Sequence, residues 1–153
     1  MSTHKNLISC PSKKQETKVI VLKGLPGCGK TFYALGILKR EKYKYLRVSK
    51  DEIRQMINGE KWANKNENVV LEIRDTIIIA AINEGFNVIV DDTNLNPHHI
   101  ERIKKLVKGK AFIEIVDLTS VPLEECIERD KSRKDSVGEK VIRDMYERYI
   151  KTG

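Results

Sequence analysis

Eight consecutive residues constrain this chain more than any other feature: Gly24, Leu25, Pro26, Gly27, Cys28, Gly29, Lys30 and Thr31. They match the pattern G-x-x-x-x-G-K followed by Ser or Thr, and they stand between an apolar run and a segment of helical spacing. Glycines let such a loop close so that its backbone N–H groups point at phosphate oxygens, and the positive end of the next helix adds to the attraction. We therefore predict that residues 24–31 bind the phosphates of a nucleoside triphosphate.

The last two residues of this loop carry functional groups that a purely structural turn does not need. The Lys30 ammonium can reach the β- and γ-phosphates, and the Thr31 hydroxyl suits a Mg²⁺ ion held between them. We therefore predict that the loop binds a nucleoside triphosphate with Mg²⁺ as the cofactor, with Lys30 as a catalytic residue and Thr31 as a metal ligand. The loop does not specify the acceptor, so a GTPase, an ATPase motor and a kinase all stay open.

Two of these classes fit the rest of the chain poorly. A guanine-specific switch needs an N-K-x-D element after a late strand, and the nearest string, at residues 64–67, falls in a predicted loop. A motor would need more chain than 153 residues. A small kinase is therefore the leading interpretation.

The spacing of apolar residues predicts an α/β fold of the kinase-like P-loop NTPase class. Short apolar runs alternate with longer segments of helical period, which is typical of a mainly parallel sheet with right-handed crossovers. Strands are expected at residues 18–23, 45–49, 86–91 and 110–118. Helices are expected at residues 30–40, from about 50, and at 66–84, 97–108, 122–133 and 139–151. The result is a three-layer sandwich with about four strands, helices on both faces and a helical lid.

Three local patterns refine the helices. Ser49 and Glu52 have the spacing of a capping box at the start of the second helix. The long helix at 66–84 is expected to bury one stripe and to end at Gly85. That stripe is predicted to contain Val70, Ile73, Ile77 and either Ala80 or Ala81.

Length and composition indicate one domain in a soluble protein. A chain of 153 residues with 40% hydrophobic and 33% charged residues has the composition of a single globular unit. Residues 1–17 lack periodicity and are expected to be a poorly ordered leader, so the domain is assigned to residues 18–153. No apolar run is long enough to span a bilayer or to act as a secretory signal, which favours a cytoplasmic protein without membrane contact. The net charge of +7 favours partners that carry phosphate.

A carboxylate and a guanidinium follow the second predicted strand. Asp51 and Arg54 are three residues apart and share a helical face, with Asp51 in the first turn, where the helix dipole favours its ionised form. An ionised carboxylate near the γ-phosphate can accept the proton of an attacking hydroxyl, and Arg54 can clamp an acceptor phosphate. The same spacing also describes an ordinary surface ion pair, and spacing alone leaves both interpretations open.

Polar residues also follow the third predicted strand, where the chain reads Asp91, Asp92, Thr93 and Asn94. Carboxylates at this position can orient Mg²⁺ or its waters, or touch an acceptor, although these residue types also form turns. Later in the chain, Arg129 and Arg133 are four residues apart on a predicted helix. They can close over the triphosphate as a cationic lid, or simply form a solvated basic stripe.

His4, His98 and His99 have no metal-ligand partners at useful spacing and are interpreted as surface histidines.

Taken in order, these segments resemble the P-loop polynucleotide 5′-hydroxyl kinases, in particular the kinase domain of the bacteriophage polynucleotide kinase-phosphatases. The resemblance is carried by GLPGCGKT at 24–31, the segment 49–55, DTNLNP at 92–97, RDKSR at 129–133 and RDMY at 143–146. It implies that Asp51 is the general base and that Arg54, Asp92 and Thr93 line the acceptor site. It also implies that Arg129 and Arg133 grip the donor phosphates, Arg133 as a catalytic residue. The chain lacks a D-x-D-x-T string, so no phosphatase domain is expected.

The predicted activity is transfer of the γ-phosphoryl group of ATP, or another NTP, to the 5′-hydroxyl end of DNA or RNA, as in nucleic acid end repair. Two alternatives remain: a P-loop kinase of a small metabolite or nucleoside, and a nucleotide-dependent nucleic-acid-binding module. The analogy also allows a homo-oligomer and a ligase or phosphatase partner.

Overall fold

A parallel sheet of four strands forms the centre of the computed structural model, which describes residues 16–59 and 65–151. The strands are β1 (Thr17–Lys23), β2 (Tyr45–Val48), β3 (Asn87–Val90) and β4 (Ala111–Asp117), in the spatial order β2-β3-β1-β4. All three neighbouring pairs are parallel. The α/β class is confirmed, and each strand begins and ends within one residue of its predicted bounds.

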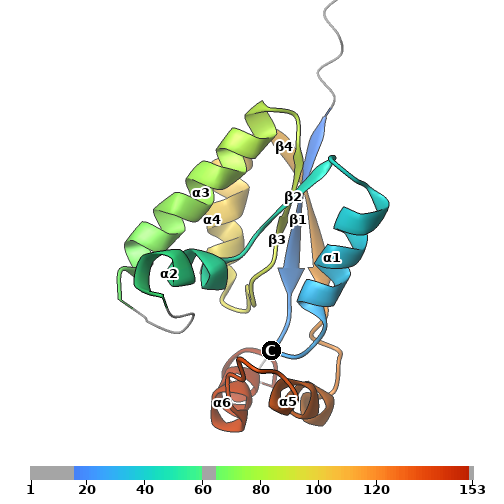
Figure 1. The fold of residues 1–153 in the computed structure, drawn as a ribbon, viewed down its shortest axis with the longest axis vertical. Helices are drawn as coiled ribbons and strands as arrows, with labels where there is room; N and C mark the ends of the chain where they lie inside the picture. The colour runs from blue at the N-terminus through green and yellow to red at the C-terminus, as the bar shows by residue number, and fades with distance from the viewer. Residues whose placement is uncertain (1–15, 60–64, 152–153) are drawn as a thin grey trace, which may run out of the picture.

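Six helices are distributed over both faces and one end of this sheet in the described part of the chain. They are α1 (Lys30–Arg40), α2 (Lys50–Asn58), α3 (Glu67–Asn83), α4 (Pro97–Val107), α5 (Leu123–Lys131) and α6 (Glu139–Tyr149). Figure 1 shows α3 and α4 on one side of the sheet and α1 on the other, which confirms the three layers. Helices α5 and α6 lie together beyond the carboxyl end of β1 (Figure 1). None of the described helices is long and apolar enough to cross a membrane.

The predicted leader, residues 1–17, lies outside the described residues except for its last two. Thr17 already belongs to β1, and its hydroxyl donates to the carbonyl oxygen of Lys110 at 3.2 Å. The strand therefore begins one residue earlier than predicted.

The two central strands are buried on both faces, which explains their nearly continuous apolar sequence. Val19 and Val21 of β1 pack with Val88 and Val90 of β3 in the core beneath α3 and α4. The alternate residues of these strands face α1 and pack in a second cluster that contains Ile20, Leu22, Ile89, Ala34 and Ile37. Burial of each such side chain stabilises the fold by about 1.5–3 kcal/mol. This rigid pair of strands carries the two loops that follow it.

The buried stripe of α3 differs from the predicted one. Its buried positions include Val70, Arg74, Ile78 and Ala81, whereas Ile73 and Ile77 are only partly buried. The side chain of Arg74 is fully buried, at 0% exposure. The prediction is confirmed for Val70 and Ala81 and wrong for Ile73 and Ile77, because a search for apolar periodicity skips a charged residue although Arg74 faces the core.

Neighbouring carboxylates make the burial of this arginine tolerable. Arg74 donates from Nε and Nη2 to Oδ1 of Asp75, at 3.2 and 2.9 Å. The other carboxylate oxygen of Asp75 accepts a hydrogen bond from Nε of Arg102 in α4, at 2.7 Å. A buried charge is costly unless it is paired and hydrogen-bonded, and this chain of contacts supplies the pairing.

Of the two predicted helix-boundary signals, the stop after α3 is present and the capping box of α2 is not. Gly85 follows α3 at a φ of 85°, and its N–H donates to Ile82, so the predicted stop is confirmed. Helix α2 begins after Ser49 as predicted, but the Ser49 side chain makes no capping hydrogen bond. The Glu52 carboxylate instead accepts from Nη1 of Arg47 at 2.6 Å. The capping box was therefore wrong, because a stronger charged donor competes for the glutamate.

Candidate active site

The phosphate-binding loop connects β1 to α1, and its backbone needs glycine at two positions. Gly27 and Gly29 have φ values of 84° and 102°, which side chains rarely adopt. A Cβ on Gly27 would also lie 2.2 Å from the carbonyl oxygen of Cys126 in α5. The loop is thus packed directly against the helical lid.

Lys30 lies with its ammonium against the carbonyl oxygens of the loop. Its Nζ donates to the carbonyl oxygens of Gly24 and Leu25, at 2.9 and 2.8 Å, and lies 3.6 Å from Sγ of Cys28. The side chain is nearly buried. A positive charge is therefore held at the edge of the cradle formed by residues 24–31, where it can interact with phosphate oxygens.

Thr31 forms a pair with Asp91, one of the two carboxylates after the third strand that the sequence analysis considered for orienting Mg²⁺ or its waters. The Thr31 hydroxyl donates to Oδ2 of Asp91 at 2.9 Å, and Nε of Arg47 donates to the same oxygen at 2.7 Å. Asp91 directly follows β3, which neighbours β1, and that position was a usable signal. One hydroxyl and one carboxylate fit Mg²⁺, which takes few protein oxygens and keeps waters. Within the described residues, no cluster of three or more acidic, His or Cys ligands exists.

Asp51 and Arg54 meet on α2 as predicted, and a third residue joins them. Arg54 donates from Nη1 to Oδ1 of Asp51 at 2.6 Å. Its Nε donates to Oε2 of Glu67 at 2.9 Å, and Nη2 pairs with the other oxygen of that carboxylate. The hydrogen bond from Arg54 lowers the pKa of Glu67. The spacing could not reveal Glu67, which begins the next helix and is 13 residues away.

Asp92 is buried at the base of this group. Its Oδ1 accepts the backbone N–H of Lys50 at 2.8 Å, while its Oδ2 is buried without a hydrogen-bond partner. Burial raises the pKa of Asp92, and the nearby charge of Lys50 opposes that rise. Burial in turn lowers the pKa of Lys50, whose side chain is nearly inaccessible. Lys50 is a second site residue that the sequence analysis did not identify.

Thr93 and Asn94 fasten the acceptor side to the phosphate loop. The carbonyl oxygen of Thr93 accepts the N–H of Gly24 at 3.0 Å. Asn94 is buried at a φ of 47°, and its Nδ2 donates to the carbonyl oxygen of Leu22 at 2.7 Å. The loop after β3 is therefore hydrogen-bonded both to the carboxyl end of β1 and to Gly24, the first residue of the cradle.

The surface assignment of His99 was wrong. His99 is partly buried in α4, and burial together with the charges of Lys50 and Arg74 lowers its pKa to about 4. The imidazole is therefore neutral at physiological pH. His98 is exposed as predicted, and His4 lies outside the described residues.

The lid helix α5 brings one of its two predicted arginines onto the loop. Arg129 has its Nη1 3.5 Å from the carbonyl oxygen of Gly27, and its Nη2 pairs with Glu125. Arg133 is half-exposed and donates from Nη2 to Oδ1 of Asp130 at 2.6 Å. Arg129 is thus at the cradle, whereas Arg133 lies at the end of the helix.

Asp130 organises the turn between α5 and α6. It accepts hydrogen bonds from the side chains of Arg133 and Ser136 and from the N–H groups of Val137 and Gly138, at 2.6–3.0 Å. Burial alone would raise its pKa, but these donors outweigh burial and lower the pKa to about 2. This residue was absent from the predicted site because its role is to shape the lid.

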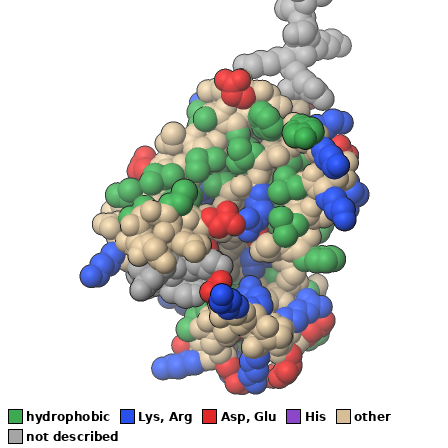
Figure 2. Space-filling model, viewed as in Figure 1, with side chains coloured by type: hydrophobic (Ala, Val, Ile, Leu, Met, Phe, Trp, Pro, Cys, Tyr) green, Lys and Arg blue, Asp and Glu red, His purple; other side chains and the backbone are tan. Residues whose placement is uncertain are grey.

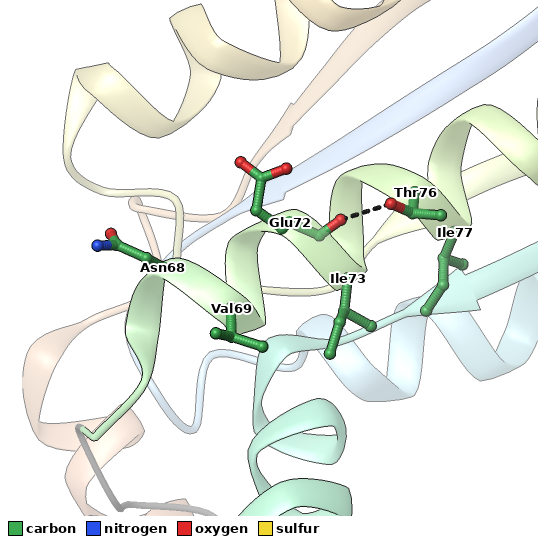
Figure 3. Close-up of a pocket in the computed structure, with 6 residues that line it drawn as sticks. All are labelled: Asn68, Val69, Glu72, Ile73, Thr76 and Ile77. Carbon is green, nitrogen blue, oxygen red and sulfur yellow. Dashed lines mark hydrogen bonds between the residues drawn. The ribbon is translucent and has the colours of Figure 1, made fainter.

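A hollow of about 370 Å³ lies elsewhere, on the outer face of α3. Figure 3 shows its lining: Asn68, Val69, Glu72, Ile73, Thr76 and Ile77. All six residues belong to one helix, and none is a predicted site residue. The predicted site residues therefore lie away from this hollow, most of them near the carboxyl ends of β1, β2 and β3.

Comparison with known proteins identifies the fold family and two relatives. The AAA domain family matches residues 19–151. A protein described as a bifunctional polynucleotide kinase/RNA ligase, from Autographa californica nuclear polyhedrosis virus, is 26% identical over 160 residues, covering 94% of this chain and 22% of that protein. The L-seryl-tRNA(Sec) kinase of Methanococcus maripaludis is 25% identical over 138 residues, covering 88% and 53%. The chain thus spans only about a fifth and a half of these relatives.

Solved structures agree with this assignment. Two structures of a Pnkp1/Rnl/Hen1 complex contain a similar chain, with TM-scores of 0.76 and 0.68. Sequence identity is 22% for the first, over 92% of this chain and 47% of that one, and 26% for the second, over 74% and 39%. The predicted resemblance to polynucleotide kinases is therefore confirmed at the level of the domain.

Proposed function

The chain belongs to the AAA domain family, here with the fold of a P-loop kinase, and on this premise we propose that it transfers the γ-phosphoryl group of ATP to the 5′-hydroxyl end of DNA or RNA. One observation carries the proposal. The N–H of Gly24 in the phosphate loop donates to the carbonyl oxygen of Thr93, and the N–H of Lys50, the residue before Asp51, donates to the carboxylate of neighbouring Asp92. These hydrogen bonds connect the potential base Asp51 to the triphosphate cradle, so their relative positions are fixed. A phosphoryl transfer that depends on the positioning of its reactants requires this.

The donor half of the reaction uses Lys30, the loop amides and the lid arginines. Lys30 and N–H groups of the loop after Pro26 bind the β- and γ-phosphates, while Arg129 of α5 and Arg133, just beyond the end of that helix, add positive charge. These groups stabilise the charge that builds on the transferred phosphoryl group and on the leaving β-phosphate. When bound, Mg²⁺ would neutralise phosphate charge, with Thr31 and Asp91 as the residues that hold it.

The acceptor half assigns the proton to Asp51. Its carboxylate accepts the proton of the 5′-hydroxyl as the oxygen forms a bond to the γ-phosphorus and the bond to the ADP oxygen breaks. Arg54, Asp92 and Thr93 line the acceptor site, with Arg54 binding the 3′-phosphate of the terminal nucleotide. The free carboxylate oxygens and the planar guanidinium suit these roles.

A phosphorylation assay with the purified full chain tests the proposal. With γ-labelled ATP and a 5′-hydroxyl oligonucleotide, the wild type transfers label, and Asp51→Asn lowers kcat about 10²- to 10⁴-fold, the usual contribution of a general base. Glu52→Gln, the neighbouring and more exposed carboxylate, is the control and keeps kcat within about twofold. A wild type without transfer, or an active Asp51→Asn variant, refutes the assignment.

A second candidate, a P-loop kinase of a small hydroxyl-bearing molecule, is supported by the ion pairs of Arg54. Both Asp51 and Glu67 already satisfy this guanidinium, so an acceptor phosphate must compete for it. Transfer to nucleosides or other small alcohols but not to oligonucleotides would favour this candidate.

We further propose that the kinase works in nucleic acid end repair beside a ligase. The support is by analogy, from the viral relative that is described as both kinase and RNA ligase and from the Pnkp1/Rnl/Hen1 complex. Co-purification of a ligase with the tagged full chain, or its absence, tests this partnership.

A further inference from the structure

A cluster of cations lies at the opposite end of the sheet from the phosphate loop. The last turn of α1 and the turn that follows it contain Lys39, Arg40, Lys42, Tyr43 and Lys44, which we call the basic turn. All five side chains are exposed. Figure 2 shows Lys and Arg side chains gathered over this end of α1, at the upper right.

These cations are mostly left without partners among the described residues. Lys44 forms a solvent-exposed pair with Glu41 at 3.4 Å, and such pairs contribute little. Lys39, Arg40 and Lys42 make no ion pair with any described residue. The cluster is therefore a concentration of uncompensated positive charge.

Tyr43 stands in the middle of this charge with its ring in solvent. Its side chain is 92% exposed, and its backbone has a φ of 65°, which is uncommon for a bulky residue. The turn is not loose: the N–H of Lys44 donates to Glu41 at 3.1 Å, and the carbonyl oxygen of Lys44 accepts the N–H of Asn87 at 2.9 Å. A strained conformation that neighbouring hydrogen bonds hold in place is typical of a functional position.

The edge strand β2 connects the basic turn to the acceptor site. Strand β2 begins at Tyr45 and ends at Val48, just before α2 with Asp51. At about 3.3 Å per residue these four residues span about 13 Å. Figure 1 shows β2 running from the turn after α1 to α2. A strand of nucleic acid with its 5′ end at Asp51, just beyond the end of β2, could follow this edge, and at about 3.4 Å per stacked nucleotide it would need at least about four nucleotides to reach the basic turn.

We propose that the basic turn is a second contact for a single-stranded nucleic acid acceptor, in which the cations bind backbone phosphates and the Tyr43 ring stacks on a base. The inference rests on the proposed polynucleotide acceptor. Positive charge interleaved with an exposed aromatic ring is the combination that binds single strands without sequence preference. Longer acceptors therefore bind more tightly than mononucleotides, and the gain is lost at high salt.

Direct binding measures the contact without phosphoryl transfer. Fluorescence anisotropy with a labelled 12-nucleotide single strand over a salt series gives the slope of log affinity against log salt. Each lost phosphate contact lowers the slope by about 0.7 for single strands, so the triple alanine variant of Lys39, Arg40 and Lys42 lowers it by about 2. The control is a triple alanine variant of exposed α4-end lysines, Lys104, Lys105 and Lys108. An unchanged slope in the first variant, or equal loss in both, overturns the proposal.

The Tyr43→Gly variant removes the stacking ring and is expected to keep the fold. Glycine accepts the positive φ, so the melting temperature stays the same or rises. KM for a 12-nucleotide acceptor rises about fivefold or more, while kcat and KM for a nucleoside 3′-monophosphate do not change. If oligonucleotides bind through the basic turn but are not phosphorylated, the proposed function fails and this inference stands. If short and long acceptors have equal KM values in all variants, the inference fails and the function stands.

Discussion

The donor and acceptor sides of the candidate active site are built from different materials. The donor side is mainly backbone: residues 24–31 form a loop with two left-handed glycines, and Lys30 bonds to its carbonyl oxygens. The acceptor side consists of charged side chains that pair with one another, as Arg54 does with Asp51 and Glu67. Backbone groups have one arrangement, whereas paired side chains can exchange partners. The donor side therefore defines a general nucleotide cradle, and the acceptor side is where substrate selectivity can reside.

The largest expected effect comes from filling the space that the donor side leaves for its backbone. In Gly27→Ala the added Cβ would lie 2.2 Å from the carbonyl oxygen of Cys126, and the φ of 84° is unfavourable for alanine. We expect ATP affinity to fall at least about 100-fold, measured by titration calorimetry. Gly109→Ala is the control, because its φ of 74° is similar but nothing lies within 4 Å. Comparable ATP affinity in the two variants would contradict the packing argument.

On the acceptor side, His99 should make stability depend on pH. Its folded pKa of about 4 lies below the ordinary 6.5, so the unfolded chain binds more protons between these values. Stability is therefore lost as pH falls from about 6.5 to about 4, by at most about 3 kcal/mol. His99→Gln should flatten this part of the urea-unfolding profile, and His98→Gln should not. The groups facing His99 are Lys50, Arg74, Glu67 and Arg102.

In the lid, the free energy of unfolding should depend on pH through an acidic residue, Asp130, and over a lower pH range than for His99. The folded pKa of Asp130, about 2, lies below the ordinary 3.8, so its contribution is present above about pH 4 and is lost as pH falls toward 2. Asp130→Asn should lower the free energy of unfolding by about 2 kcal/mol at pH 7, and the difference should shrink on acidification. Asp144→Asn, an exposed position in α6, is the control. A difference that persists unchanged at pH 2.5 would show that charge is not the cause.

The smallest expected effect comes from removing the charge of Glu67, the carboxylate that an acceptor phosphate must replace at Arg54. Glu67→Gln removes the charge that competes for this guanidinium, so KM for a 3′-phosphorylated mononucleotide should fall a few-fold in the phosphorylation assay. The loss of stability should stay below about 1 kcal/mol, because the glutamate is partly exposed. Glu101→Gln, which removes an exposed partner of Lys104, should leave KM unchanged. An increased KM would mean that Glu67 positions Arg54 for the substrate and does not compete.

The sequence predicted the position of the loop at residues 24–31 between β1 and α1. The pattern of residues 24–31 is confined to eight consecutive residues, so spacing reveals it, whereas the contacts of the loop with Thr93 and Cys126 come from distant parts of the chain. The strands were located for a similar reason, since runs such as Val19–Leu22 are apolar at every position. Helical spacing is also a local pattern, and it predicted the helix that carries Arg129.

The acceptor side was only partly predicted, because its contacts join distant residues. Glu67 reaches Arg54 from another helix, and the buried charge of Arg74 is compensated by Asp75, whose other carboxylate oxygen pairs with Arg102 of α4. Apolar periodicity cannot register a buried arginine, and spacing rules apply within one helix.

The hydrogen bonds of the loop after β3 have a consequence for how such a kinase can diversify. Asn94 and the carbonyl oxygen of Thr93 attach that loop to Leu22 and Gly24, with no contribution from side chains of α2 or α3. Substitutions in those two helices, apart from Asp51, can therefore alter the recognition of a new alcohol without removing the hydrogen bonds that join the loop after β3 to the phosphate loop.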